Sequence, residues 1–376
     1  MKKLLLGILL AAGLLLGILA ATIRTRYGGP VVSFPPRTTL LLLPASAVEK
    51  VAVLPEAPGN IAVSAEGRVF FNFHPEARPA LSVVEWVDGK AVPFPDATLD
   101  LYDNVFSVRI DRQGRLWTLG TGFHGLRPPR LLAFDLTTRK LVHRWDVPRD
   151  VAGLGSYVQD FQVSPDGKHV YLADIGVLSK KPALLVHDVD AMTGRRLLEG
   201  DPSVTDRPYL IDAKGTEMLL LGGLYPMHPA LDSIGLDAGG EWLYFGPMSH
   251  ETLFRVRTRD LLDASLSRPE LSERVEEYGT KPQSDGISLD TAGNVYLTDV
   301  EHGALSILSP DRTLRTLVKD PRWRWPDGLS FGTGDWLYVT DSDLPDIMLK
   351  SRSHMTRSAP YFIWRLRTGI PGTPGH

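Results

Sequence analysis

The amino-acid sequence predicts an all-β fold, a six-bladed β-propeller built from four-stranded antiparallel blades. The pattern behind this prediction is clearest between Gln283 and His302, QSDGISLDTAGNVYLTDVEH. An acidic residue and a glycine open an alternating strand, a Thr-Ala-Gly-Asn turn follows, and a β-branched and aromatic strand ends on Asp299. This order of residues is typical of a β-hairpin. An isolated hairpin is only marginally stable in water, so this one must pack against other strands.

The second observation is that the hairpin pattern recurs along the chain. Copies open at Asn60, Asn104, Asp160, Asp232, Asp285 and Asp327. Their spacings of 44, 56, 72, 53 and 42 residues lie mostly near the roughly 40–50-residue period of four-stranded propeller blades. A solenoid is the alternative fold, but solenoid repeats are usually shorter and more regular. The long interval before Asp232 predicts an insertion between blades three and four.

The N-terminus, residues 1–23, predicts an export segment. Two lysines precede an apolar run from Leu4 to Ile23, which is long enough as a helix to span the roughly 30 Å hydrocarbon core of a bilayer. The apolar region of a signal peptide is usually shorter, and Leu19-Ala-Ala21 is a poor cleavage site. An uncleaved membrane anchor is therefore favoured over a cleaved signal peptide. Either form places the body of the protein in the periplasm or outside the cell.

The remaining segments follow from their patterning. Residues 24–47 are expected to be a linker, and residues 48–368 the propeller. Within it, Val48–Leu54 alternates and is expected to close the ring beside Tyr361–Arg367. Arg259–Tyr278 has helical spacing and is split by Pro269, so it predicts two short helices. Residues 369–376 have no periodicity and are expected to be a disordered tail.

Composition restricts the possible functions. The chain has 376 residues, a net charge of −3 and no cysteine, which excludes disulfides, thiolate catalysis and iron–sulfur clusters. The GxGxxG match at residues 120–125 is followed by Arg-Pro-Pro-Arg rather than by a helix, so it does not predict a dinucleotide site. No nucleotide or haem cofactor and no nucleic-acid partner is expected. A monomer that contacts the membrane only through residues 4–23 is expected.

The residues that open the hairpins are the candidate site. The first strand of each propeller blade lines the central channel, so equivalent residues should form a ring at one mouth of it. The structural alternative is that each Asx side chain caps its own turn. Two carboxylates about 5 Å apart repel by roughly 3 kcal/mol at an effective dielectric constant of 20, so a cluster calls for a cation. The predicted ligand-binding residues are Asn60, Asn104, Asp160, Asp232, Asp285 and Asp327.

Oxygen ligands select a hard ion. The ring therefore predicts a divalent cation, most simply Ca²⁺, held by Asp160, Asp232 and Asp285. Asp285 and Asp232 are also the candidate catalytic residues. Two further residues are added to the ligand site. Trp325 lies in an Arg-Trp-Arg-Trp run that could stack on a ligand or pack within the protein, and His302 follows a predicted strand end.

Several of these segments carry a family resemblance. GSYVQDF within residues 151–174, SDGISLD and YLTDVEH within 284–302, and WPDGLSF and DWLYVTDS within 325–342 resemble bacterial members of the major royal jelly protein/Yellow family over about residues 48–368. The resemblance implies a secreted six-bladed propeller. It also implies dopachrome chemistry for Yellow-type members and the binding of biogenic amines in the channel by others. Gly120 departs from the family, which usually has an Asp there.

A more distant similarity is to the gluconolactonase and senescence-marker propellers. That resemblance implies a divalent metal held at the positions of Asn60, Asp160, Asp232 and Asp285. Only Asp285 keeps the residue type of that family, and Asn60 stands where it has a Glu.

Three functions are thus predicted from the sequence. The first is an extracytoplasmic propeller that binds a small cationic or aromatic ligand in its channel. The second is a metal-dependent, lactonase-like hydrolase, and the third is a scaffold for protein interactions. The missing glutamate at position 60 and the lack of a histidine base favour the binding protein over the enzyme.

Overall fold

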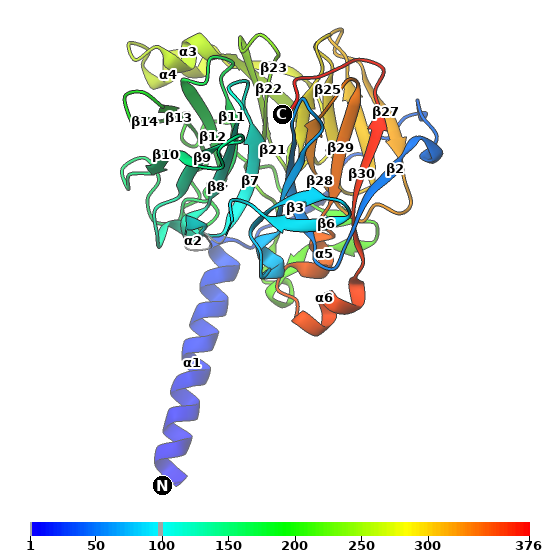
Figure 1. The fold of residues 1–376 in the computed structure, drawn as a ribbon. Coiled ribbons are helices and arrows are strands. Elements are labelled where there is room, and N and C mark those ends of the chain that lie inside the picture. The colour runs from blue at the N-terminus through cyan, green and yellow to red at the C-terminus, as the bar shows by residue number, and fades with distance from the viewer. Residues whose placement is uncertain (1, 97–100) are drawn as a thin grey trace.

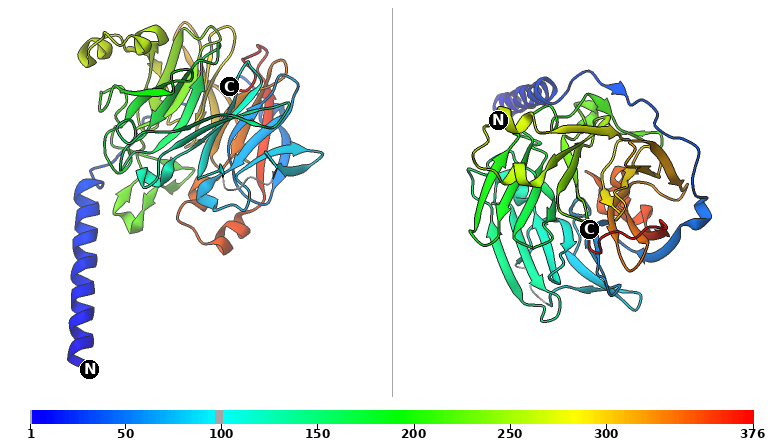
Figure 2. Two further views of the ribbon diagram at one scale, coloured as in Figure 1. Left: turned by 60° about the vertical axis from the view of Figure 1, so that its left-hand side comes forward. Right: turned by 90° about the horizontal axis from the view of Figure 1, so that it is seen from above.

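The computed structural model describes residues 2–96 and 101–376. Within these residues, the longer strands form six four-stranded antiparallel sheets arranged around a central axis (Figures 1 and 2). The predicted six-bladed β-propeller is confirmed.

The strands of each sheet follow one another from the axis outward. The inner strands, which contact one another around the channel, are β3 (Pro58–Val63), β7 (Val105–Ile110), β11 (Val158–Val163), β20 (Leu231–Leu236), β24 (Ile287–Leu289) and β28 (Pro326–Phe331). The second strands are β4 (Val69–Phe73), β8 (Arg115–Gly120), β12 (His169–Asp174), β21 (Trp242–Pro247), β25 (Val295–Asp299) and β29 (Trp336–Asp341). The third strands are β5 (Val83–Val87), β9 (Arg130–Asp135), β13 (Ala183–Asp188), β22 (Thr252–Arg257), β26 (Ala304–Leu308) and β30 (Tyr361–Arg367). The outer strands are β6 (Lys90–Pro93), β10 (Leu141–Asp146), β14 (Thr193–Leu197), β23 (Glu276–Thr280), β27 (Leu314–Lys319) and β2 (Glu49–Leu54).

The turn between each inner strand and its partner explains why the hairpin pattern was visible in the sequence. Each turn contains a glycine with positive φ, a conformation that costs other residues energy. These glycines are Gly67, Gly114, Gly167, Gly240, Gly293 and Gly334. Neighbouring blades then bury their apolar side chains against each other, as Trp117 and Leu119 of β8 do with Phe161 and Val163 of β11.

The ring is closed by strands from the two ends of the chain, as predicted. β2 pairs antiparallel with β30, with Leu54 opposite Tyr361 and Glu49 opposite Arg365. The last pair is also an ion pair, with 2.9 Å between Arg365 Nη2 and Glu49 Oε2. Closure removes the free edge that an open sheet would leave.

Short elements lie at both ends of the channel, most of them in connections between strands of the same blade. The predicted helices between β22 and β23 are α3 (Thr258–Leu262) and α4 (Arg268–Ser272). At the opposite end lie α1 (Lys2–Arg26), α2 (Gly122–Gly125), α5 (Leu344–Ile347) and α6 (Arg352–Ser358), as Figure 1 shows. Single 3₁₀ turns occur at η1 (Ala45–Ala47) and η2 (Pro75–Ala77).

The predicted insertion between blades three and four is present. It contains β15 (Tyr209–Leu210), β16 (Asp212–Ala213), β17 (Thr216–Glu217), β18 (Leu219–Leu220), η4 (Leu221–Gly223) and β19 (Tyr225–Pro226). The segment expected to be a linker contributes β1 (Val32–Ser33), which pairs in parallel with β15. The linker is therefore attached to the body rather than free.

The expectation of a disordered tail is wrong. Residues 369–376 enter the end of the channel away from α1, where the C-terminus lies near the axis in Figure 2. The backbone N–H of Ile110 donates to the carbonyl of Gly375 (3.1 Å), and the N–H of Gly375 donates to the carbonyl of Phe331 (3.0 Å). The imidazole of His376 lies 2.7 Å from the amide oxygen of Gln162. Backbone hydrogen bonds of this kind need no periodicity in the sequence.

Candidate functional site

A cavity of about 590 Å³ lies in the channel at the α1 end. Its inner part is formed by the first residues of the inner strands, and its outer part by loops of the insertion and of the α5–α6 connection. The cavity thus joins the region of the predicted ring to the surface of the protein.

Irregular strand pairing turns polar side chains into this cavity. The register between inner and second strands shifts near the start of most blades, as between Leu231 and Ser233 and between Pro326 and Leu329. Asp232 and Asp327 occupy these shifts and line the cavity. Such bulges bend the strand and re-aim a side chain. Asp232 and Asp327 face the cavity for this reason.

Five of the six predicted ring residues meet at the cavity, namely Asn60, Asp160, Asp232, Asp285 and Asp327. Asn104 does not line it. Its backbone has a φ of 56°, and its amide donates to Thr121 Oγ1 at 2.8 Å, so it serves the turn before β7. Phe106 lines the cavity in that blade instead, at the register shift between Val105 and Ser107.

The ring is not level. Asp232 and Asp327 are the second residues of their inner strands, whereas Asn60 and Asp160 are the third residues of theirs. The repeat alone suggested one common height. The offset places Asn60 and Asp160 one residue further along their strands, towards the end that the tail occupies.

Arg109 is a central residue of the site that sequence reasoning missed. It lies in β7, is only 1% exposed, and projects between two members of the ring. Its Nη2 lies 3.0 Å from Asp160 Oδ1, and its Nη1 donates to Asn60 Oδ1. The available signal was the charged residue between Val108 and Ile110 in a strand whose other residues predict burial, because buried charges need a partner.

Asp160 is well supplied with hydrogen-bond donors. Besides Arg109, Ser107 Oγ donates to its Oδ1 at 2.7 Å, and the backbone N–H of Phe161 donates at 2.9 Å. Burial raises the pKa of Asp160, and the Arg109 guanidinium opposes that shift. Because the two side chains are in contact, we treat them as an ion pair.

Asp232, Asp285 and Asp327 lack a comparable cation. Burial and the charges of Asp285, Asp160 and Asp327 hold the pKa of Asp232 well above its usual range. Burial and the charge of Asp285 do the same to the pKa of Asp327. Burial raises the pKa of Asp285 to about 6, although Trp325 Nε1 donates to its Oδ2 at 2.6 Å. Among the described residues, Asp232 Oδ1 is buried and has no hydrogen-bond partner.

Lys281 is a second buried cation, and its charge is felt by Asp232. Its Nζ donates to the carbonyl oxygens of Met248 and Pro282, each at 3.1 Å. Burial lowers the pKa of Lys281 to about 7, and the charges of Asp232 and Glu251 oppose that change. Lys281 is therefore a weak counter-charge for the aspartates at neutral pH.

The other two predicted ligand residues lie outside the cavity wall. Trp325 is fully buried and acts on the site through its hydrogen bond to Asp285. His302 sits in the turn after β25, where its Nδ1 lies 2.9 Å from Asp299 Oδ1. The carboxylate of Asp299 raises the pKa of His302, so this histidine belongs to a local pair.

The cavity has an aromatic wall that the sequence did not reveal. His74, Phe106, Tyr157 and His124 follow one another with ring-centre distances of 5.2, 5.2 and 4.6 Å. Burial lowers the pKa of His74 to about 3, so its ring is neutral at physiological pH. Met227 and Met248 add apolar surface to the lining. Nearer the surface, His228 Nδ1 lies 2.5 Å from Asp206 Oδ2.

The residues present do not fit the expected calcium site. Calcium takes six to eight oxygen ligands, and Asp160 already binds the guanidinium that lies between it and Asn60. Among the described residues, no three His, Asp or Glu side chains come together in a way that could hold a metal ion. The cationic group of this channel floor is Arg109.

Comparison with solved structures agrees with the fold. A luciferin-regenerating enzyme superposes with a TM-score of 0.57 and 13% identity, over 87% of this chain and 97% of that one. The calcium-binding protein regucalcin from Agrobacterium tumefaciens also gives 0.57 and 13%, over 90% and 98%. A gluconolactonase from Xanthomonas campestris gives 0.54 and 15%, over 91% and 98%. At these identities the similarity shows the fold alone.

Sequence comparison is more specific. Major royal jelly protein 1 of Apis mellifera is 26% identical over 242 residues, which are 59% of this chain and 54% of that protein. Major royal jelly protein 3 of the same species is 24% identical over 245 residues, 59% and 42% of the two chains. The chain thus spans about half the length of the curated relatives that it matches. The family model of the major royal jelly proteins matches residues 104–351, and the chain belongs to this family.

Proposed function

We propose that this protein binds a small organic cation with an apolar or aromatic body in the cavity of its channel. The observation that carries the proposal is the set of buried carboxyl groups that have no fixed counter-charge. Asp232 is 3% exposed, and its Oδ1 lacks a partner, which is costly unless a ligand supplies a donor. An ammonium group would supply both the charge and the hydrogen bonds.

The apolar and aromatic residues that line the same cavity define the rest of the ligand. Phe106 and Tyr157 present aromatic surface, and Met227 and Met248 present flexible apolar surface. Pockets for small molecules combine such walls with a few polar groups that fix orientation. Aromatic rings also attract cations directly. A primary amine attached to an aromatic or aliphatic body satisfies both parts of the cavity.

Metal-dependent lactone hydrolysis is not proposed. Its ion would have to share Asn60 and Asp160 with the guanidinium of Arg109, which already hydrogen-bonds both side chains. A metal ion bound to these two side chains would lie next to the Arg109 guanidinium, and two positive charges repel strongly in a buried site. The fixed cation of Arg109 therefore favours binding over metal-dependent catalysis.

Ligand binding should be coupled to proton release. Without a cation, burial and mutual repulsion keep the pKa values of Asp232, Asp285 and Asp327 raised. A bound ammonium group stabilises the ionised carboxylates and so lowers these pKa values. Protons leave when the amine binds, and affinity therefore increases as the pH rises through about 6, the pKa of Asp285.

Calorimetry with 2-phenylethylamine tests the proposal. The amine should bind, whereas its neutral analogue 2-phenylethanol should not bind measurably. Asp232→Asn should weaken binding of the amine by about tenfold or more, equivalent to about 1.4 kcal/mol. Glu273→Gln, which changes an exposed residue next to α4 at the other end of the propeller, should leave the affinity unchanged. Equal affinities for the amine and the alcohol, or an unchanged Asp232→Asn variant, would contradict the proposal.

The position of the protein in the cell is a second part of the proposal. α1 is long and apolar enough to cross a membrane, and none of its side chains is buried against the body. Such a helix is compatible with a signal sequence or an anchor. We propose that it exports the propeller and keeps it at the cytoplasmic membrane.

A further inference from the structure

The C-terminal end of α1 is attached to the rim of the cavity. Tyr27 Oη and Arg26 Nη2 donate to the carbonyl oxygen of Leu178, at 3.1 and 3.2 Å. The ring of Tyr27 packs edge-on against Tyr225, with 6.0 Å between ring centres, and Lys180 Nζ lies 5.4 Å from the Tyr27 ring. Leu178, Lys180 and Tyr225 all line the cavity. The helix and the cavity mouth therefore belong to the same end of the propeller.

Exposed apolar side chains gather at this end. Among the described residues outside α1 and residues 40–42, the most exposed large apolar side chains are Leu126, Leu154 and Leu349, at 70%, 71% and 63%. They come from separate loops, and Phe123, Leu178 and Leu221 are also exposed there. We name these side chains the apolar rim: Phe123, Leu126, Leu154, Leu178, Leu221 and Leu349.

Three residues of the apolar rim also have a strained backbone conformation. Phe123, Leu221 and Leu349 have φ values of 50°, 52° and 57°. This left-handed conformation is an outlier for bulky residues and costs on the order of 1–3 kcal/mol each. Glycine or asparagine would relieve the strain and also remove apolar surface from water. Strain that persists at exposed apolar side chains points to a role for them at this end of the propeller, where Leu221 and Leu349 also line the mouth of the cavity.

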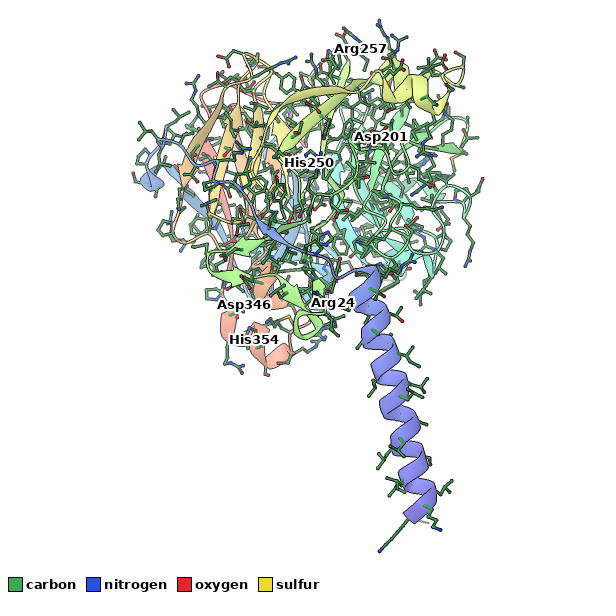
Figure 3. The ribbon with its side chains drawn as sticks, turned by 180° about the vertical axis from the view of Figure 1, so that it is seen from behind. Arg24, Asp201, His250, Arg257, Asp346 and His354 are labelled. Atoms are coloured by element: carbon green, nitrogen blue, oxygen red, sulfur yellow. The ribbon has the colours of Figure 1, made fainter. Side chains whose placement is uncertain are left out.

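The other end of the channel is closed, and its surface is charged rather than apolar. Residues 369–376 fill it, with His376 beside Gln162, and α3 and α4 cover that side with charged residues. In Figure 3, Arg24 at the base of α1 lies at the same end as Asp346 and His354 of the α5–α6 region, and Arg257 lies at the opposite end. A ligand reaches the cavity from the α1 end.

We propose that the α1 end of the propeller lies on the surface of a phospholipid bilayer and that the cavity takes its ligand from that bilayer. This inference rests on the proposed function and gives the ligand class: an amphiphile with an ammonium head and an alkyl chain. α1, about 37 Å long at 1.5 Å per residue, spans the roughly 30 Å hydrocarbon core. The apolar rim enters the interface around its base.

The charges around the mouth suit the headgroup region. Arg24 ends the apolar run, and Arg127, whose side chain is 68% exposed, follows α2 beside Leu126. Lys180 stands between α1 and the cavity. Cations next to exposed leucines are typical of surfaces that lie in a membrane interface. An amine in the bilayer surface then has a short path to Asp232.

Fluorescence quenching in vesicles tests the orientation. The chain has no cysteine, so Leu154→Cys and Leu349→Cys each take a single environment-sensitive label, and Ala264→Cys between α3 and α4 is the matched control. The full chain is reconstituted in vesicles of equal parts phosphatidylcholine and phosphatidylglycerol. Labels at 154 and 349 should be quenched by lipids with a nitroxide near the headgroup and protected from aqueous iodide. The label at 264 should behave in the opposite way.

Two outcomes overturn the proposal. The first is that the labels at 154 and 349 are as accessible to iodide as the label at 264. The second is that they are protected from iodide without being quenched by nitroxide lipid, since a protein partner would then cover the rim. Neither readout needs a ligand, so a failure here is distinct from a failure of amine binding.

A second measurement tests the supply of ligand from the membrane. The double variant Leu126→Glu and Leu154→Glu changes no residue that lines the cavity. It should keep its affinity for 2-phenylethylamine in detergent and lose about tenfold or more of its affinity for dodecylamine in vesicles, about 1.4 kcal/mol. Unchanged dodecylamine binding would refute delivery from the bilayer.

Discussion

Arg109 determines the charge at the floor of the cavity. Its guanidinium is buried and hydrogen-bonds both Asn60 and Asp160, so Arg109→Met leaves the Asp160 carboxylate buried without a cation. Removing one partner of a buried ion pair typically costs about 3–5 kcal/mol. We expect a loss of this order in the free energy of unfolding, measured by urea denaturation. Adding Asp160→Asn to that variant should recover part of it, and a double variant no more stable than the single one would contradict the ion pair.

Asp285 makes stability depend on pH. In the unfolded chain its pKa is about 3.9, and in the folded protein burial raises it to about 6. The folded state therefore holds a proton that the unfolded state lacks between these values. This contribution is complete below about pH 4 and is lost as the pH rises through about 6. Asp285→Asn should be the more stable protein at pH 8, by on the order of 1–3 kcal/mol, and the difference should vanish near pH 4 in thermal denaturation.

The sequence indicated some site residues and missed others for physical reasons. An acidic residue at the start of a hairpin is visible in a short stretch of sequence, so Asp232, Asp285 and Asp327 could be predicted as site residues. The register shift that brings Phe106 rather than Asn104 into the cavity depends on pairing with β8, which no local pattern shows. The contact of Arg109 with Asp160 joins neighbouring blades. Such contacts follow from the closed ring.

At the level of elements, β2 shows how one terminal strand maintains the ring. Leu54 is 1% exposed and packs into the core, whereas Val53 on the other face is 49% exposed. Leu54→Lys should lower the free energy of unfolding by about 2–5 kcal/mol, because it removes a core side chain and buries a charge. Val53→Lys should change stability little. Similar melting of both variants and the wild type would show that β2 does not hold the ring closed.

The elements themselves were largely predictable. The hairpin turns and the pairing of Val48–Leu54 with Tyr361–Arg367 appear in alternating apolar patterns, and the helices on either side of Pro269 appear in their spacing. The prediction that residues 369–376 are disordered was wrong, because hydrogen bonds to strands of the channel hold this tail in place. Gly372 forms an isolated β-bridge with Asp290, and Pro374 forms one with Phe331. A segment ordered in this way has no pattern of its own.

For the whole molecule, export is the prediction to test first. Lys2 and Lys3 precede the apolar helix, and basic residues tend to stay on the cytoplasmic side. Alkaline phosphatase fused after His376 should be active, because that reporter folds only outside the cytoplasm, where disulfides form. A fluorescent protein that matures only in the cytoplasm should remain dark at the same position. The reverse result would contradict export of the propeller.

The pairing of β2 with β30 also has a consequence for the timing of synthesis. β2 leaves the ribosome early, but its partner Tyr361–Arg367 follows only after about 300 further residues. At roughly 5–20 residues per second, that is a delay of about 15–60 seconds. During this delay Ala52 and Leu54 have no sheet to join, while the blades between them and the end of the chain can assemble one after another. The first strand of the body to be made is thus among the last to be placed, and the newly made chain spends that interval as an incomplete ring.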